Sequence, residues 1–209
     1  MFAARSKLDR GLDAFEQRAW KRARKLLAEA LQEEERVLGC YHLGLLYWRG
    51  LGGPADKRAA ADCFARAAND GHPGAETAYG IALRSGVGVA KNDALARQHF
   101  RSAAGAGDAE AMVQLATMSE PEDARHWLTR ASETGYAPAM LHLSDFWINR
   151  DPVEALAWLY ASVALSGDEA ARKRASALAK EMTAREIAEA QKLGRGYVKD
   201  IQDRARGSR

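Results

Sequence analysis

The chain repeats itself at an interval of 36 residues. When Tyr41–Gly71 is aligned with Thr77–Gly107, five glycine or phenylalanine positions coincide. The matched pairs are Gly44 with Gly80, Gly50 with Gly86, Gly52 with Gly88, Phe64 with Phe100, and Gly71 with Gly107. A period of this length indicates a repeat architecture, in which one unit cannot bury its apolar face alone and packs against its neighbours along the chain.

Shorter copies of the unit follow at Ala111–Gly135 and Ala139–Gly167, and both lack the glycine loop. An N-terminal stretch, Leu12–Glu35, has the spacing of a helix pair without the small residues, so it is either a cap or a degenerate first unit. We therefore predict a single solenoid domain over residues 1–209. Its parts are an N-terminal cap or degenerate repeat (1–36), four repeats (37–168), and C-terminal capping helices with a frayed tail (169–209).

Each unit has the pattern of two helices. Apolar and small residues recur at helical intervals, first at Gly39, Leu43 and Tyr47 and then at Ala60 and Phe64. Small residues let two helices approach closely, and a glycine after the second helix can adopt the positive φ that ends it. Proline is scarce in the chain, which also favours helix. These features predict an all-α protein built from antiparallel helix hairpins.

Two further helices are predicted after the repeats, where they would cover the exposed face of the last hairpin. Thr183 is the expected N-cap of the second, with Glu186 as its capping-box partner. Carboxylates that fall at loop ends are expected to cap helix amides in the same way: Asp56, Asp93, Asp108 and Asp168.

The segment Ser85–Ala96 contains Gly86 and Gly88 and resembles the start of a phosphate-binding loop. Such a loop follows a β-strand and opens the helix that holds the phosphate. Here it follows a predicted helix over residues 75–84 and repeats a segment from the preceding unit. We therefore predict a turn between packed helices, with Asp93, beside Asn92, capping the next helix.

No catalytic or metal-binding pattern is present in the sequence. The five histidines, His42, His72, His99, His126 and His142, lie outside any zinc-ligand spacing. Cys40 and Cys63 form no CxxC motif, and we expect buried free thiols. We predict no catalytic residue, no metal and no cofactor, and a protein that is not an enzyme.

The repeated pattern, Ala-x-x-x-Leu-Gly, an aromatic residue, Gly-x-Gly, Ala-x-x-x-Phe, Ala-Ala and a final Gly, resembles the Sel-one-like (SLR) repeats, relatives of the tetratricopeptide repeats. Its clearest copies are Leu38–Gly71 and Ala75–Gly107, and Gly53-Pro54 and Tyr79 depart from it. The resemblance implies a right-handed α-solenoid with a C-terminal helical cap that scaffolds protein complexes or binds partner segments. The sequence Trp158–Leu193 is similar to the ending of many bacterial members, which indicates a bacterial source.

By register with tetratricopeptide-like units, one face of each first helix would line a concave groove. Exposed Tyr, Trp and Arg are typical of protein-binding hot spots. We predict a non-enzymatic interaction or scaffolding module whose groove binds an unidentified protein or peptide through Leu38, Tyr41, Leu45, Trp48, Thr77, Ile81, Arg84, Val113 and Leu141.

Three alternatives remain open at the level of sequence. The N-terminal helices or a superhelical twist could cover Tyr41 and Trp48, the apolar groove could form a homodimer, or the glycine turns could serve a nucleotide-binding or enzymatic role. The net charge of +3 is small, and glutamates interleave the basic C-terminal segment, so we do not expect nucleic acid as a partner. The sequence has no apolar run long enough to span a membrane and no signal-peptide pattern at its start, so we expect a cytoplasmic protein.

Overall fold

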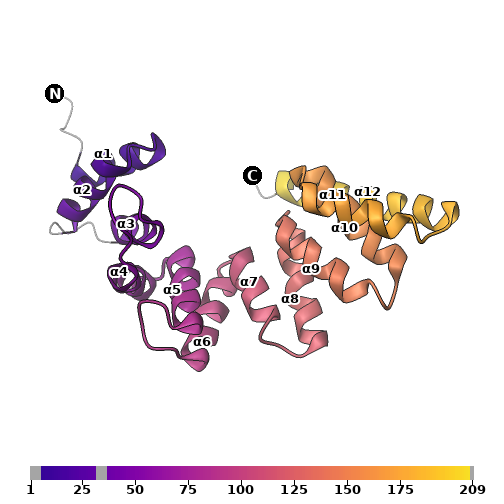
Figure 1. The fold of residues 1–209 in the computed structure, drawn as a ribbon, viewed down its shortest axis with the longest axis horizontal. Helices are drawn as coiled ribbons and strands as arrows, with labels where there is room; N and C mark the ends of the chain where they lie inside the picture. The colour runs from indigo at the N-terminus through magenta and orange to yellow at the C-terminus, as the bar shows by residue number, and fades with distance from the viewer. Residues whose placement is uncertain (1–5, 32–36, 208–209) are drawn as a thin grey trace. The chain divides into compact units, whose positions relative to one another are not determined.

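A computed structural model describes residues 6–31 and 37–207, and within these ranges the chain forms helices and no strands (Figure 1). The prediction of an all-α protein is confirmed. In chain order the helices are α1 (Lys7–Glu16), α2 (Trp20–Ala30), α3 (Val37–Arg49), α4 (Lys57–Asn69), α5 (Pro73–Ser85), α6 (Asp93–Gly105), α7 (Ala109–Ala116), α8 (Pro121–Glu133), α9 (Ala137–Trp147), α10 (Pro152–Ser166), α11 (Glu169–Ala179) and α12 (Ala184–Gly207).

The helices form two compact units, residues 1–108 and 109–209. We call these the N-terminal and C-terminal units and describe each by itself. That the chain is a single solenoid domain stays a prediction. The parts of the predicted N-terminal cap at residues 1–5 and 32–36, and the tail residues 208–209, lie outside the described residues.

The N-terminal unit contains three helix hairpins, α1/α2, α3/α4 and α5/α6. The first hairpin packs on α3 through a core that contains Leu27, Leu43 and Leu46, all buried. Residues 7–30 therefore form a hairpin of their own whose apolar face is covered by the first repeat.

Glycine lets the two helices of a hairpin cross closely. A Cβ atom placed on Gly44 would lie 2.6 Å from the Phe64 ring, and one on Gly80 would lie 2.6 Å from the Phe100 ring. Both phenylalanine rings are almost fully buried. The repeated Gly and Phe are thus one packing unit, in which the ring occupies the space that a glycine side chain leaves empty.

The glycine loop is a turn, as predicted. Gly86 ends α5 in the left-handed conformation, with φ of +68°. Gly88 has φ of +80°, and a Cβ atom there would lie 2.0 Å from the carbonyl oxygen of Lys57, the first residue of α4. Gly52 meets the carbonyl of Trp20, at the start of α2, in the same way, with a Cβ distance of 2.5 Å. The second glycine of each loop therefore packs the turn against the preceding hairpin.

Side-chain caps start most of the predicted helices. Asp56 accepts from the amide of Ala59 and Asp168 from that of Ala170, as expected. The prediction for α6 was wrong by one residue: Asn92 is the N-cap and accepts from the amide of Leu95 at 3.0 Å. Asp93 is instead the first helical residue, where its carboxylate favours the helix N-terminus.

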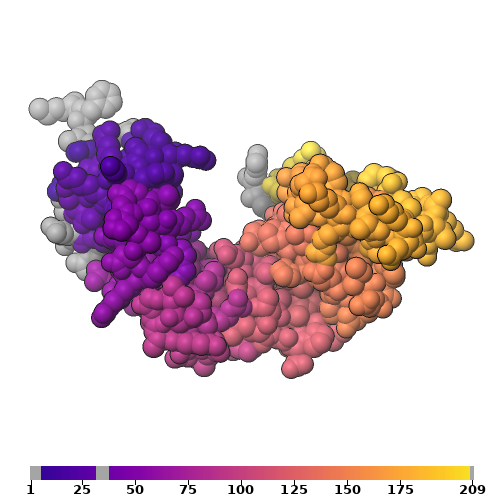
Figure 2. Space-filling view, in the orientation of Figure 1, coloured from indigo at the N-terminus to yellow at the C-terminus, as the bar shows by residue number. Residues whose placement is uncertain are grey.

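The C-terminal unit contains the hairpins α7/α8 and α9/α10, followed by α11 and α12, which both pack on α10 (Figure 2). The predicted capping box is present, because Thr183 Oγ1 accepts from the amide of Glu186 at 3.3 Å and Glu186 accepts from the amide of Thr183 at 2.7 Å. A core that includes Leu156, Leu159 and Ala190 joins α12 to α10. The predicted C-terminal helical cap is thus confirmed.

A partly buried polar cluster holds α12 on α10. Glu154 accepts hydrogen bonds from Trp158 Nε1 at 3.0 Å and from the Tyr197 hydroxyl at 2.7 Å. The rings of Trp158 and Tyr197 stack with their centroids 4.2 Å apart. Burial, with the hydrogen bond to Glu154, raises the pKa of Tyr197. The hydroxyl therefore remains a donor throughout the neutral range.

Candidate protein-binding surface

The predicted groove residues lie on α3, α5, α7 and α9, the first helices of the four repeats. Tyr41 is half-buried, and its ring stacks on His72 with a centroid distance of 4.3 Å. A Cβ atom on Gly74 would lie 3.0 Å from the Tyr41 hydroxyl oxygen. Tyr41 therefore joins α3 to the start of α5, and much of its ring is covered by the next hairpin.

Two of the three residues equivalent to Tyr41 are still more buried. Thr77 is 2% exposed and donates its hydroxyl to the carbonyl of Pro73, while Val113 is 6% exposed. Leu141 is half-buried. The expectation that Thr77 and Val113 point to open groove space is not met, because in α5 and α7 this position belongs to the protein interior.

The more exposed position lies one residue further along each first helix. His142 is exposed there, and His42, Ala78 and Gln114 are half-buried. A step of one residue turns a helix by about 100°, which moves the side chain from the interior to the edge of the surface. The sequence interpretation missed this position, although His42 and His142 recur at it in two different repeats.

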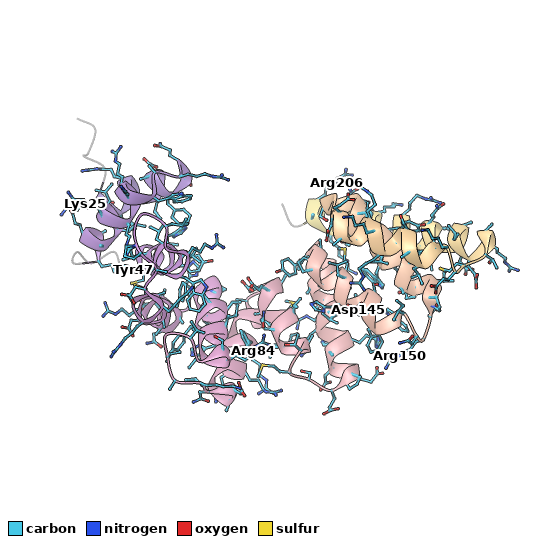
Figure 3. The ribbon with its side chains drawn as sticks, viewed as in Figure 1. Lys25, Tyr47, Arg84, Asp145, Arg150 and Arg206 are labelled. Atoms are coloured by element: carbon cyan, nitrogen blue, oxygen red, sulfur yellow. The ribbon has the colours of Figure 1, made fainter. Side chains whose placement is uncertain are left out.

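Leu38, His42 and Leu45 form one stripe of α3, since residues spaced by four and three share a face of a helix. Leu38 is 46% exposed, which is high for a large apolar side chain. Ile81 and Arg84 of α5 are half-buried, and Figure 3 marks Arg84 on this helix. We call the set Leu38, His42, Leu45, Trp48, Ile81 and Arg84 the α3–α5 face.

Trp48 is half-buried by α4 rather than fully open. The ammonium group of Lys57 lies 4.3 Å from the Trp48 ring centroid and donates to the Trp48 carbonyl at 2.5 Å. On its other side Trp48 contacts Phe64, with a centroid distance of 6.0 Å. Phe15 of α1 contacts His42, and the centroids of the two rings lie 4.8 Å apart. Tyr41 and Trp48 are thus covered in part by α4 and the start of α5.

Cys63 is not activated as a nucleophile. Burial, together with the neighbouring Cys40, raises the pKa of Cys63 to about 12. The thiol is therefore protonated at neutral pH, and a thiol is a far weaker nucleophile than a thiolate. Among the residues that the structure describes, no three His, Cys, Asp or Glu side chains gather closely enough to hold a metal ion.

The glycine turn also has the wrong surroundings for a phosphate. A phosphate site needs backbone amides that point into open space. On the side of Gly88 where a Cβ atom would stand, the turn faces the carbonyl oxygen of Lys57, whose partial negative charge would repel a phosphate. This side of the turn is therefore packed against the start of α4 and is not open to a ligand.

Repeated helix hairpins that pack through small residues, closed by a helical cap, define an α-solenoid repeat protein. The Sel1 repeat model matches residues 37–72, 73–108, 109–136 and 134–166, which is more than half of the chain. The chain belongs to the Sel1 repeat family, and the resemblance seen in its sequence is confirmed. Sel1 repeats are generally protein–protein interaction modules, and proteins built from them are typically non-enzymatic scaffolds.

Solved structures share the fold at low sequence identity. A Sel1 repeat protein from Oxalobacter formigenes is 22% identical with a TM-score of 0.73, over 92% of this chain and 83% of its own. The immunity protein Pa5087 from Pseudomonas aeruginosa is 20% identical with a TM-score of 0.55, over 97% of this chain and 88% of its own. No curated protein matches the sequence. These likenesses support the fold alone.

None of the described helices combines the length and the apolar content that a membrane crossing requires.

Proposed function

We propose that this protein is a non-enzymatic interaction module that binds a segment of a protein partner on its α3–α5 face. The proposal is supported by the family, whose repeats generally bind proteins. It keeps Leu38, Tyr41, Leu45, Trp48, Ile81 and Arg84 from the sequence prediction, with Tyr41 as a supporting residue beneath the surface. A cytoplasmic location and a bacterial source stay predictions from the sequence.

The observation that carries the proposal is the exposure of Leu38. Among the side chains that the structure describes, it is the most exposed of the large apolar ones at 46%, and it stands on the same stripe of α3 as Leu45. Burying one leucine side chain in an interface contributes roughly 1.5–3 kcal/mol. An apolar stripe beside a tryptophan and an arginine has the composition of an interface core.

Pull-down from the native organism tests the proposal with the variant Leu38→Asp/Leu45→Asp. Val87→Asp serves as the matched control, because Val87 is also an exposed apolar residue of this unit, at 36%, but lies in the turn after α5. We expect the double variant to lose the partners that the wild type and Val87→Asp retain. Recovery of every partner at wild-type yield by a folded double variant would refute the site.

Site-specific photo-crosslinking separates a partner from self-association. A benzoylphenylalanine at residue 38 should form a heterologous adduct, whereas one at residue 87 should not. An adduct of twice the chain mass, with a dimer in light scattering that Leu38→Asp abolishes, would replace the proposal with homodimerisation. A rise in melting temperature with millimolar ATP or GTP would instead support the nucleotide alternative.

A further inference from the structure

A surface groove lies between α10 and α12 in the C-terminal unit. The two helices meet at Gly194, where a Cβ atom would lie 2.8 Å from the Ala157 carbonyl oxygen and 3.1 Å from Tyr160 Cβ. Beside this close approach is an open pocket of about 480 Å³ whose floor includes Tyr160, Ala164 and Val198. We call it the α10–α12 groove. Because Gly194 has no side chain, the helices touch at this point while the larger side chains beside it stand apart.

The outer side of the groove is positively charged. Gln191, Arg195, Lys199 and Gln202 of α12 line it, and all four side chains are exposed. They follow one another at intervals of three and four residues, so they share one flank of the helix. The same flank continues to Arg206 at the end of α12 (Figure 3).

Most carboxylates of α12 lie away from this flank. Glu186, Glu189 and Asp200 fall on the far side of the helix by its period, and Asp203 lies at the edge of the flank, four residues after Lys199. Within residues 6–31 and 37–207, neither Arg195 nor Lys199 forms an ion pair, whereas Arg204 of the same helix pairs with Glu133 at 2.7 Å. The two cations beside the groove therefore keep their charge available for a ligand.

We propose that the α10–α12 groove binds an acidic amphipathic helix of a protein partner. Apolar side chains of that helix would pack on Tyr160 and Val198, while its Asp and Glu side chains would pair with Arg195 and Lys199. Helix-in-groove binding of this kind combines apolar anchors with complementary charge at the rim. The proposal concerns helices of the other compact unit and does not depend on the α3–α5 face.

The composition of the groove favours a peptide over a nucleic acid. The floor is aromatic and aliphatic and offers a phosphate backbone little to bind. Phosphate recognition relies on many cations along a surface, whereas here only two of the residues that line the pocket are cations, and they border an apolar floor. An apolar floor beside two cations matches a ligand that is apolar on one face and acidic on the next.

A displayed library of helical 16-residue peptides tests the proposal. The peptides carry Leu at positions of one face, and the flanking positions are randomised among Glu, Gln and Lys. We expect selection on the wild-type chain to enrich Glu at the flanks. Selection on Arg195→Glu/Lys199→Glu is expected to enrich Lys instead. An absence of enriched helices, or the same flanking residues from both proteins, would overturn the proposal.

Fluorescence anisotropy with the most enriched Glu-flanked peptide measures the effect. Arg195→Glu/Lys199→Glu should raise its Kd at least tenfold. Lys173→Glu/Arg185→Glu is the matched control, because it makes the same change of charge at exposed residues of α11 and α12 that do not line the groove. If both variants raised the Kd of the peptide equally, binding would depend on the overall charge of the protein and not on the groove, and the proposed site would be refuted.

Two further measurements use the same variants. A benzoylphenylalanine at the exposed Ala164 should crosslink to the enriched peptide, and failure to do so would place the peptide elsewhere and refute the groove as its site. Tighter binding of a 20-base-pair DNA than of the peptide at 150 mM salt, lost in Arg195→Glu/Lys199→Glu, would assign the surface to nucleic acid. Self-association that this variant abolishes in light scattering would assign it to a second copy of the chain.

Discussion

The contact between the glycine turn and the preceding hairpin can be measured with a pair of alanine substitutions. Gly88 and Gly71 both have φ of +80°, so Ala at either position meets the same backbone strain. They differ in their surroundings, because a Cβ atom on Gly88 would lie 2.0 Å from the Lys57 oxygen, whereas nothing lies within 4 Å of one on Gly71. Gly71→Ala is therefore the matched control for Gly88→Ala.

The expected magnitudes follow from the shared backbone strain and from the difference in surroundings. A non-glycine residue in the left-handed region costs about 1–2 kcal/mol, which is the whole effect expected for Gly71→Ala. At Gly88 the new methyl group also forces the turn away from α4, and overpacking of this kind costs typically about 1–3 kcal/mol more. We therefore expect Gly88→Ala to lower the free energy of unfolding by about 2–5 kcal/mol.

Urea denaturation followed by circular dichroism at 222 nm gives the two free energies of unfolding, and the slope of each transition shows whether both variants unfold as one unit. The difference between them isolates the packing contact from the backbone strain. If Gly88→Ala and Gly71→Ala were equal within about 0.5 kcal/mol, which is the error of comparing such values, the turn would not be packed on α4 and the reasoning would fail.

Three further predictions concern single contacts. Gly80→Ala should destabilise the chain by about 1–3 kcal/mol in thermal unfolding by driving a methyl group into the Phe100 ring, and Gly80→Ala/Phe100→Leu should recover part of that loss. His72 accepts from the Ala75 amide through Nδ1 at 3.1 Å, and partial burial, with His42 nearby, lowers its pKa. The unfolded chain therefore binds the proton more readily, so the melting temperature should decrease as the pH falls through about 6.5. His72→Asn keeps an acceptor that does not titrate and should reduce this slope, and an unchanged slope would contradict the cap. Glu154→Ala removes the acceptor of Tyr197 and Trp158 and should cost about 1–3 kcal/mol, and a Tyr197→Phe/Glu154→Ala double-mutant cycle without coupling would refute the pairing.

The repeat unit could be predicted from the sequence because its signals are local. Gly86 ends a helix and Phe100 fills a glycine gap within one hairpin, so their spacing along the chain is enough to identify them. Thr183 and Glu186 form a capping box three residues apart for the same reason. Fold class, helix pairs and most caps therefore followed from periodicity and composition.

The binding face could be predicted only in part, since exposure depends on how hairpins stack. The sequence places Tyr41, Thr77 and Val113 at one helical position but does not say that the next hairpin covers it. The sequence predicted Asp93 as the cap of α6, whereas the structure has Asn92 in that position. A displacement of one residue is ordinary for the ends of helices. The α10–α12 groove was missed because it joins residues of α10 to residues of α12 that lie 27 to 42 positions further along the chain, although the spacing of Arg195 and Lys199 on one flank is visible in the sequence.

The contacts of the glycine turns bear on the order in which the N-terminal unit assembles. Gly52 packs on the start of α2 and Gly88 on the start of α4, so each turn contacts a helix that precedes it in the chain. On a ribosome that helix has already been synthesised when the turn emerges, and domains generally form from the N-terminus during synthesis. Each new hairpin therefore meets a completed surface to pack against, and the unit can assemble in the order in which it is translated.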